Sequence, residues 1–520
     1  MRKKKFAPSL FPYILVFLFI SFSCSKDSDI FAETVQENIE KEIDNQDETG
    51  TEEDNIDENP VIDNEVSSDL KAFPTAEGAG AYASGGRGGN VIHVTNLNDS
   101  GPGSFREALY TKGPRIIVFD VSGTIVLRSG IYLSGADYGN LTIAGQTAPK
   151  GGITLQGQYT YFNNLNNLVL RYIRFRQDRD DGSPYLSALV TESCSNVIVD
   201  HISVSYGQDE CVLFWDDGKN PAGNHTLQRS LISEGKTAII VGSTAESGRI
   251  DNAGDCSVIK NFISYMHRTP NVSGNASFEI INNVIYNWQI RLSSVNSDSQ
   301  IAHIGNYYKP GPVTNQYVKE NATNSDYINK TFDTSGISAF TGSIYTESNY
   351  YEGLSAMNEN NWNAWYNFFE SAKADESQFR LSALPNLLGP ISILDAPQAF
   401  EDVLGDVGAN KSLNGDGTFT FYLDENDEVY LSDAENGTDS FSVNQVGYLQ
   451  PRWYAASRVN MAFPELPASS RNSGFDTDRD GMPNVWEIAN GFNPDVDDSA
   501  LDADGDGYTN LEEYLNLVDM

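Results

Sequence analysis

Two stretches near the end of the chain place acidic residues at a spacing that suits a metal ion. Both follow the pattern D-x-D-x-D-G-x5-E, and its acidic positions are Asp476, Asp478, Asp480, Glu487, Asp502, Asp504, Asp506 and Glu513. Calcium takes six to eight oxygen ligands, and this spacing wraps single carboxylates around one point while the last glutamate supplies two oxygens. The glycine allows the sharp turn. Two complete copies therefore predict two calcium-binding loops.

Short apolar segments follow the acids in each copy. Trp486–Ala489 and Leu511–Leu515 predict short helices that begin inside the loops. Asn484 and Asn510 are the expected polar ligands near the end of each loop. With these features, residues 468–520 resemble the calcium-binding repeats of dockerins and thrombospondin type 3 segments, which are structural or adhesive. We expect a small C-terminal calcium-loop module without a catalytic role.

Any other chemistry must be positioned by the long middle of the chain, which carries a regular repeat. Its apolar, β-branched segments begin at Asn140, Asn167, Asn196, His225, Cys256 and Phe278. No helical pattern separates them, and a β-sandwich would show closer spacing, about 8–12 residues. Strands that return every 22 to 31 residues, as here, predict an all-β fold, a right-handed parallel β-helix, in which each coil stacks on the last. Such a solenoid offers an elongated groove that suits a polymer.

Several long motifs in this region are familiar. They are Gly85–Gly89, Val94–Ala108, Phe119–Ile125, Thr142–Pro149, Val197–His201 and His267–Pro270. In this order they resemble the bacterial pectate lyases of polysaccharide lyase family 1, from about Phe73 to beyond Trp288 and more weakly to Pro467. The resemblance implies cleavage of an acidic plant-type polysaccharide, pectate or pectin, by calcium-assisted β-elimination. It gives a lyase domain over 71–467.

The elimination removes the proton at C5 of a uronate, and the resemblance assigns the base to the arginine of an R-x-P motif. Here this is Arg268, in Arg268-Thr269-Pro270. A guanidinium ordinarily stays protonated, so the reaction needs a special environment or an alkaline medium. From its residue type alone, Arg268 is a carboxylate clamp. Both roles place it at the uronate whose bond is cleaved.

Three further residues are candidates through the same resemblance. Lys236 matches the groove lysine that binds a substrate carboxylate, although residue type alone predicts a solvated lysine. Asp200 and His201 lie in a strand pattern, where a histidine often satisfies hydrogen bonds between coils. We expect these two to support the site.

A calcium ion in the groove needs acids of its own. Asp209 and Glu210 are adjacent, and adjacent carboxylates are costly unless a cation or base lies between them. Asp181 is a further candidate ligand on a loop. Two positions depart from the family pattern: Ser187 stands where an acid is expected, and Ser273 where a second arginine is common.

The beginning of the chain predicts export. Residues 1–24 have a basic start, a short apolar run and a sequence ending at Cys24 that resembles a bacterial lipoprotein cleavage site. Residues 25–70 are strongly acidic and predict a disordered spacer. We expect a lipidated Cys24 and an outer-membrane lipoprotein at the cell surface, or otherwise a secreted or periplasmic protein. Membrane contact would be through the lipid anchor only.

The net charge of −38 excludes a generic nucleic-acid partner, and we expect a monomer. Two other functions remain open, a β-helix pectin hydrolase with two acids and a surface glycan-binding protein without activity. Four residues either line sugar subsites or belong to the core, namely Trp215, Tyr286, Trp288 and Arg291. Cys194, Cys211 and Cys256 are expected to be single buried thiols.

Overall fold

The computed structural model describes residues 70–177, 187–207, 209–216, 222–243, 254–266, 268–288, 292–295, 298–315, 332–333, 342–365, 376–440 and 463–520. By its contacts the chain divides into Met1–Val61, which lies outside the described residues, and Ile62–Met520. The expected leader, the lipidation site and the expected spacer up to residue 69 fall outside the described part. Among the described residues, no helix has both the length and the apolar character needed to cross a membrane.

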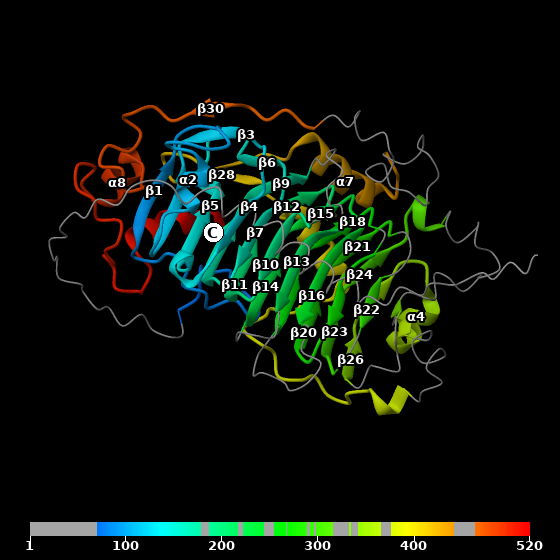
Figure 1. Cartoon of the computed structure of the whole chain (residues 1–520). Helices are drawn as coiled ribbons and strands as arrows, with labels where there is room; N and C mark the ends of the chain where they lie inside the picture. The colour runs from blue at the N-terminus through cyan, green and yellow to red at the C-terminus, as the bar shows by residue number, and fades with distance from the viewer. Residues whose placement is uncertain are drawn as a thin grey trace, which may run out of the picture. The chain divides into compact units, whose positions relative to one another are not determined.

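Three parallel sheets form the body of the described chain, and within each sheet the strands of successive coils pair with one another (Figure 1). The first sheet contains β1 (Asn90–Val94), β2 (Arg115–Phe119), β5 (Leu141–Ala144), β8 (Asn166–Arg171), β11 (Ser195–Asp200), β14 (Gly223–Gln228), β17 (Cys256–Ile259), β20 (Ser277–Ile281), β23 (Gln300–Ile304) and β26 (Ser343–Glu347). The second contains β3 (Val121–Leu127), β6 (Ile153–Gly157), β9 (Ile173–Gln177), β12 (Ser203–Ser205), β15 (Leu231–Ser233), β18 (Phe262–Ser264), β21 (Val284–Tyr286), β24 (Tyr307–Lys309) and β27 (Tyr350–Tyr351). The third contains β4 (Ile131–Ser134), β7 (Thr160–Asn163), β10 (Leu189–Glu192), β13 (Glu210–Asp216), β16 (Thr237–Ser243), β19 (Asn271–Ser273), β22 (Ser293–Val295) and β25 (Phe332–Asp333).

Each coil visits the first, second and third sheets in turn, so the predicted parallel β-helix is confirmed. Val197 in β11, for example, lies in register between Leu168 in β8 and His225 in β14. Apolar side chains from all three sheets fill the interior in one continuous core. β-Branched residues suit these positions because they pack well on a pleated surface.

The corner between the first and second sheets is held by an asparagine ladder. The side-chain amide of Asn261 donates to Asn283, and Asn283 donates to Asn306, both over 3.0 Å. Asn306 in turn donates to Asn349 over 2.8 Å. Since each asparagine is buried, these bonds satisfy polar groups that would otherwise be stranded between coils.

Shorter elements cover the sheets. They are α2 (Phe105–Leu109), η1 (Ala136–Tyr138), η2 (Gly145–Thr147), α4 (Ser355–Glu359), η5 (Asn361–Trp365), η6 (Glu376–Gln378), α6 (Ala396–Gly405), β28 (Lys411–Leu413), β29 (Phe419–Phe421), α7 (Glu425–Asn436), β30 (Ser469–Ser470), α8 (Asn484–Asn490), α9 (Asn510–Leu515) and η9 (Asn516–Asp519). Helices α6 and α7 pack on the second sheet through Val403 and Tyr430. Helices α8 and α9 confirm the two short helices predicted after the acidic repeats.

The C-terminal segment packs against the first coils of the β-helix. Met482, Trp486 and Leu511 share an apolar cluster with Ile116 and Val118 of β2. Strand β30 pairs antiparallel with β3 of the first coils, and the two are labelled next to each other at the top of Figure 1. The predicted boundary between 71–467 and 468–520 therefore falls in a segment whose two sides share a core.

His225 in β14 gives the fold a specific response to acid. The side chain is buried, and its Nε2 donates to the carbonyl oxygen of Cys194 over 2.9 Å. Burial lowers the pKa of His225 to about 4, although this hydrogen bond acts in the opposite direction. The imidazole is therefore neutral in the folded protein at pH values where it is already charged in the unfolded chain.

We expect His225→Gln to remove part of the acid sensitivity. Below the ordinary pKa of 6.5, the unfolded chain takes up a proton that folded His225 refuses, so this residue costs stability as pH falls towards 4. The free energy of unfolding of the wild type should fall relative to the variant by about 2 kcal/mol between about pH 7 and about pH 5. Urea unfolding at both pH values measures this, and a constant difference would contradict the assignment.

Candidate active site and calcium loops

The predicted groove residues meet on successive coils at the corner between the second and third sheets. The backbone nitrogen of Ala188 donates to Glu210 O over 3.1 Å, and that of Thr237 donates to Asp209 O over 3.0 Å. The nitrogen of Arg268 donates to Lys236 O over 3.0 Å. Since neighbouring strands lie about 4.8 Å apart, these contacts place Asp209, Lys236 and Arg268 in one short row.

Local backbone geometry explains why polar residues gather at this corner. Tyr206, Glu234 and Tyr265 each follow a strand of the second sheet and take positive φ values of 71°, 53° and 55°. This conformation turns the chain sharply. The few residues that follow before the third sheet are not bound by strand alternation, and Asp209, Lys236 and Arg268 occupy them.

Glu210 is the most buried acid of the row. Ser187 Oγ donates to Glu210 Oε2 over 2.6 Å, a contact that the sequence did not predict. Burial raises the pKa of Glu210 to about 8, and the charge of Asp209 adds to this. Lys236 and Arg268 act in the opposite direction, which shows that both cationic side chains lie within electrostatic reach of Glu210.

Lys236 and Asp209 form a partly exposed ion pair. Lys236 Nζ donates to Asp209 Oδ1, and their side chains are 27% and 22% exposed. Burial lowers the pKa of Lys236, but the neighbouring charge and hydrogen bond of Asp209 outweigh it, so the pKa is raised. The lysine is therefore a fixed positive charge within reach of solvent.

The donor set at this corner fits a calcium ion in part. Asp209 and Glu210 supply two carboxylates from adjacent residues, Lys236 pairs with Asp209, and the charges of Lys236 and Arg268 oppose that of Asp209 at Glu210. Carboxylate oxygens are the ligands that calcium prefers. Asp181, the third predicted ligand, lies outside the described residues.

Asp200 and His201 lie at the other end of β12, at the corner between the first and second sheets. Asp200 Oδ2 is 2.8 Å from Arg171 Nε and 2.9 Å from His201 Nδ1. His201 Nε2 is 3.3 Å from Asp406 Oδ1, and its ring stacks on Tyr172. The structure thus brings this pair together, but at the corner between the first and second sheets beside Arg171 and Asp406, and not at the corner that holds Asp209.

The aromatic candidates divide between core and surface. Tyr286 is 0% and Trp288 3% exposed, and both belong to apolar clusters. Trp215 is partly exposed on β13, whereas Arg291 lies outside the described residues. The described cysteines Cys194, Cys211 and Cys256 are buried free thiols, as expected.

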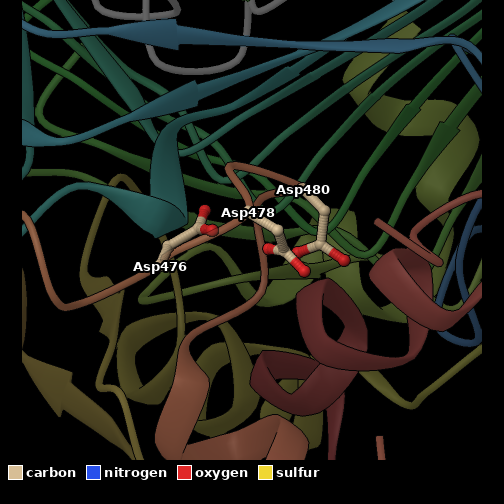
Figure 2. A group of neighbouring side chains, drawn as sticks. All are labelled: Asp476, Asp478 and Asp480. Carbon is tan, nitrogen blue, oxygen red and sulfur yellow. The ribbon is translucent and has the colours of Figure 1, made fainter. Parts of the chain in front are cut away.

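The acidic repeats form two compact carboxylate groups. In each, one oxygen from every aspartate lies within 4.8 Å of the others, and the groups are Asp476, Asp478 and Asp480, and Asp502, Asp504 and Asp506. Figure 2 shows the first group, with the carboxylates of Asp478 and Asp480 side by side. The expected ligands Asn484 and Asn510 instead close the loops, accepting hydrogen bonds from the backbone nitrogens of Thr477 and Ala503.

The closing glutamates face the aspartates in both loops. Burial raises the pKa of Glu487 to about 8, and Asp480, Asp478 and Asp476 add to the shift. Burial also raises the pKa of Glu513, with Asp506 next in effect. Like charges held this close require a cation to be stable in their ionised form.

Stacked parallel coils with a charged row at one corner define a β-helix protein suited to an extended acidic polymer. No family model matches the chain. A curated relative, "Probable pectate lyase C" of Emericella nidulans, is 33% identical over 452 residues, which cover 86% of this chain and 93% of the relative. A protein of the same name from Aspergillus flavus is 31% identical over 461 residues, 87% of this chain and 95% of the relative.

The chain therefore belongs to the pectate lyase family. Among solved structures, the cedar pollen allergen Jun a 1 has a TM-score of 0.47 at 15% identity, over 64% of this chain and 92% of that chain. A thermostable pectate lyase has a TM-score of 0.46 at 16% identity, over 65% of this chain and 97% of that chain.

Proposed function

We propose that this enzyme cleaves polygalacturonate by β-elimination at the row formed by Asp209, Glu210, Lys236 and Arg268. The observation that carries the proposal is that two acidic and two cationic side chains from successive coils meet at one partly exposed corner. Membership of the pectate lyase family supports the reaction type.

The row supplies a candidate base, and water supplies the proton for the leaving oxygen. Arg268, as the neutral guanidine, takes the proton from C5 of the uronate, and the electron pair of that C–H bond becomes the C4–C5 double bond. The bond from C4 to the glycosidic oxygen breaks, and this oxygen takes a proton from water. No water is added across the cleaved bond, so the new end carries the double bond.

Lys236 and the two acids position the substrate. Lys236 forms an ion pair with Asp209 in the free protein and would bind a uronate carboxylate once the polymer is bound. Asp209 and Glu210 would hold a calcium ion, which withdraws charge from the uronate carboxylate and makes the C5 proton more acidic. Ser187 fixes Glu210 through its hydrogen bond.

The two acidic repeats are proposed as further calcium sites with no part in catalysis. Each contains three aspartates whose oxygens meet, and a glutamate that faces them. The resemblance to dockerin and thrombospondin type 3 repeats supports this assignment. We also propose the division into a lyase domain over 71–467 and a calcium-loop segment over 468–520.

For location, we propose a bacterial, exported, monomeric enzyme tethered through a lipidated Cys24. The basic start, apolar run and cysteine of residues 1–24 support this, and the acidic residues 25–70 would act as a spacer. Labelling with a radioactive fatty acid tests the anchor, since Cys24→Ser should abolish both the label and membrane association.

A substrate screen tests the proposed activity. The full chain should generate absorbance from the conjugated double bond on polygalacturonate in alkaline buffer with millimolar calcium. We expect this absorbance to rise more slowly on highly methylated pectin, because Lys236 and calcium both require free carboxylates. Binding to polyuronates without any scission would instead support a glycan-binding protein.

A further inference from the structure

The first calcium loop, residues 476–487, buries carboxylate oxygens that have no hydrogen-bond partner. Within the described part of the chain, these are both oxygens of Asp478, Oδ2 of Asp480 and both oxygens of Glu487. Asp480 and Glu487 are 0% exposed. Buried charges without partners strongly destabilise a fold, so this geometry calls for a cation between them.

The positions of these acids match what a divalent cation needs. Oxygens of Asp476, Asp478 and Asp480 lie within 4.8 Å of one another, and all three aspartates act electrostatically on Glu487. Figure 2 shows the three aspartate side chains on one turn of the loop. Three single carboxylates and one two-oxygen glutamate provide most of a calcium coordination sphere.

The second loop, residues 502–513, is different. Asp502, Asp504 and Asp506 are exposed, and no acidic oxygen of this loop is among the buried atoms that lack a partner. Exposed carboxylates are solvated by water and gain less from an ion. The two loops therefore share a sequence pattern but differ in how strongly their acids depend on a cation.

The first loop also touches the beginning of the β-helix. His93 of β1 places Nε2 3.6 Å from Asp476 Oδ2 and 3.1 Å from Arg479 O. Its Nδ1 is 2.9 Å from Asp120 Oδ1, and Asp120 O accepts from the backbone nitrogen of Arg471 over 2.7 Å. The first acid of the loop thus contacts β1, and the segment before the loop is bound to Asp120, the residue that follows β2.

Helices α8 and α9 carry this contact into the core. The rings of Trp486 and Tyr514 lie 5.4 Å apart within the cluster that includes Ile116 and Val118. Beyond α8, Arg87 pairs with Glu512 over 2.8 Å. Helix α8, which contains Glu487, therefore packs directly on the first coils through Trp486.

We propose that a divalent cation in the first loop clamps residues 463–520 onto the first coils of the β-helix, as a stabilising site separate from the groove. The inference rests on the proposed calcium binding by the repeats and is independent of the lyase chemistry. The second loop contributes little to this clamp because its acids are exposed.

Thermal unfolding of the full chain with calcium or with chelator tests the clamp. Calcium at about a hundredfold above its dissociation constant should raise the melting temperature of the wild type by about 3–5 °C through this site. Glu487→Gln should lose most of this gain, whereas the matched change in the exposed loop, Glu513→Gln, should keep it. Both variants retain the groove acids, so a stabilising ion there affects all three proteins equally.

The change in melting temperature that Glu487→Gln causes in chelator distinguishes a role in ion binding from a role in packing. The amide has nearly the same shape and no charge, so the variant in chelator should melt no lower than the wild type. A side chain needed only for packing would lower both melting temperatures by the same amount. That result, or a calcium response equal to that of the wild type, would overturn the proposal; Asp478→Asn provides the same test if Glu487→Gln does not fold.

Two readouts keep this inference distinct from the proposed lyase activity. The Glu487→Gln variant should cleave polygalacturonate by β-elimination at the wild-type rate at 25 °C in excess calcium. Apart from cuts in the expected spacer over 25–70, limited proteolysis in chelator should cut first within residues 463–520 of the wild type, and calcium should protect these sites. Protection by calcium with no lyase activity would support the clamp while contradicting the proposed function.

Discussion

Arg268→Ala is expected to lower kcat/KM on polygalacturonate by about 10³- to 10⁴-fold. The Arg268 side chain, as the neutral guanidine, is the base in the proposed reaction, and it lies in the row with Lys236 and within electrostatic reach of Glu210. Arg268→Lys should restore little of the lost rate, because a lysine cannot reproduce the position and planar geometry of the guanidinium. Initial rates of double-bond absorbance in saturating calcium measure the effect.

A matched variant separates this loss from a general effect of removing an arginine. Arg380 is exposed and lies beside Ile344 of the first sheet, remote in sequence from the groove residues. Arg380→Ala should therefore keep the wild-type rate. Full activity of Arg268→Ala would rule out its assignment as the base, and the melting temperature of the variant shows whether the protein is intact.

Removal of calcium is expected to produce the second large effect. Chelation should reduce the elimination rate by about 10³-fold or more, since the uronate carboxylate then keeps its full charge. Glu210→Gln should lower the rate about 10- to 100-fold at limiting calcium, and excess calcium should recover part of it. The calcium dependence of the initial rate measures both.

The acidic repeats, proposed as further calcium sites, provide the control for this second prediction. Glu513→Gln changes an acid of the second loop and leaves Asp209 and Glu210 in place, so its calcium dependence of activity should match that of the wild type. A Glu210→Gln variant with the same calcium dependence as the wild type would show that the groove ion is held elsewhere.

The fold was predictable because its signal repeats along the chain. Each coil returns an apolar, β-branched strand after 22 to 31 residues in the predicted set, and stacking is the arrangement that buries such strands. The asparagine ladder has a signal too, since Asn261, Asn283 and Asn306 each precede a strand of the second sheet. One asparagine at the same place in successive coils indicates a corner.

The clustering of the aspartates in the acidic repeats was predictable for a different reason. These aspartates come from one short stretch, so spacing alone determines which carboxylates meet. The sequence could not show that Glu487 is buried and Asp502 exposed, because this depends on where the segment packs.

The hydrogen bond from Ser187 to Glu210 and the position of Asp200 and His201 could not be predicted. The first joins two coils, and its register is set by the stacking of whole strands. The surroundings of Asp200 and His201 depend on Asp406, which contacts His201 from a segment more than two hundred residues later in the chain. Long-range contacts of this kind leave no local pattern in the sequence.

The most direct test of the proposed reaction is the mass of its products in water enriched in oxygen-18. Elimination predicts oligogalacturonides with a C4–C5 double bond, a matching rise in ultraviolet absorbance and no heavy oxygen at the cleaved bond. Hydrolysis would instead add one heavy oxygen for each bond cleaved and leave the absorbance unchanged, and that result would contradict the account.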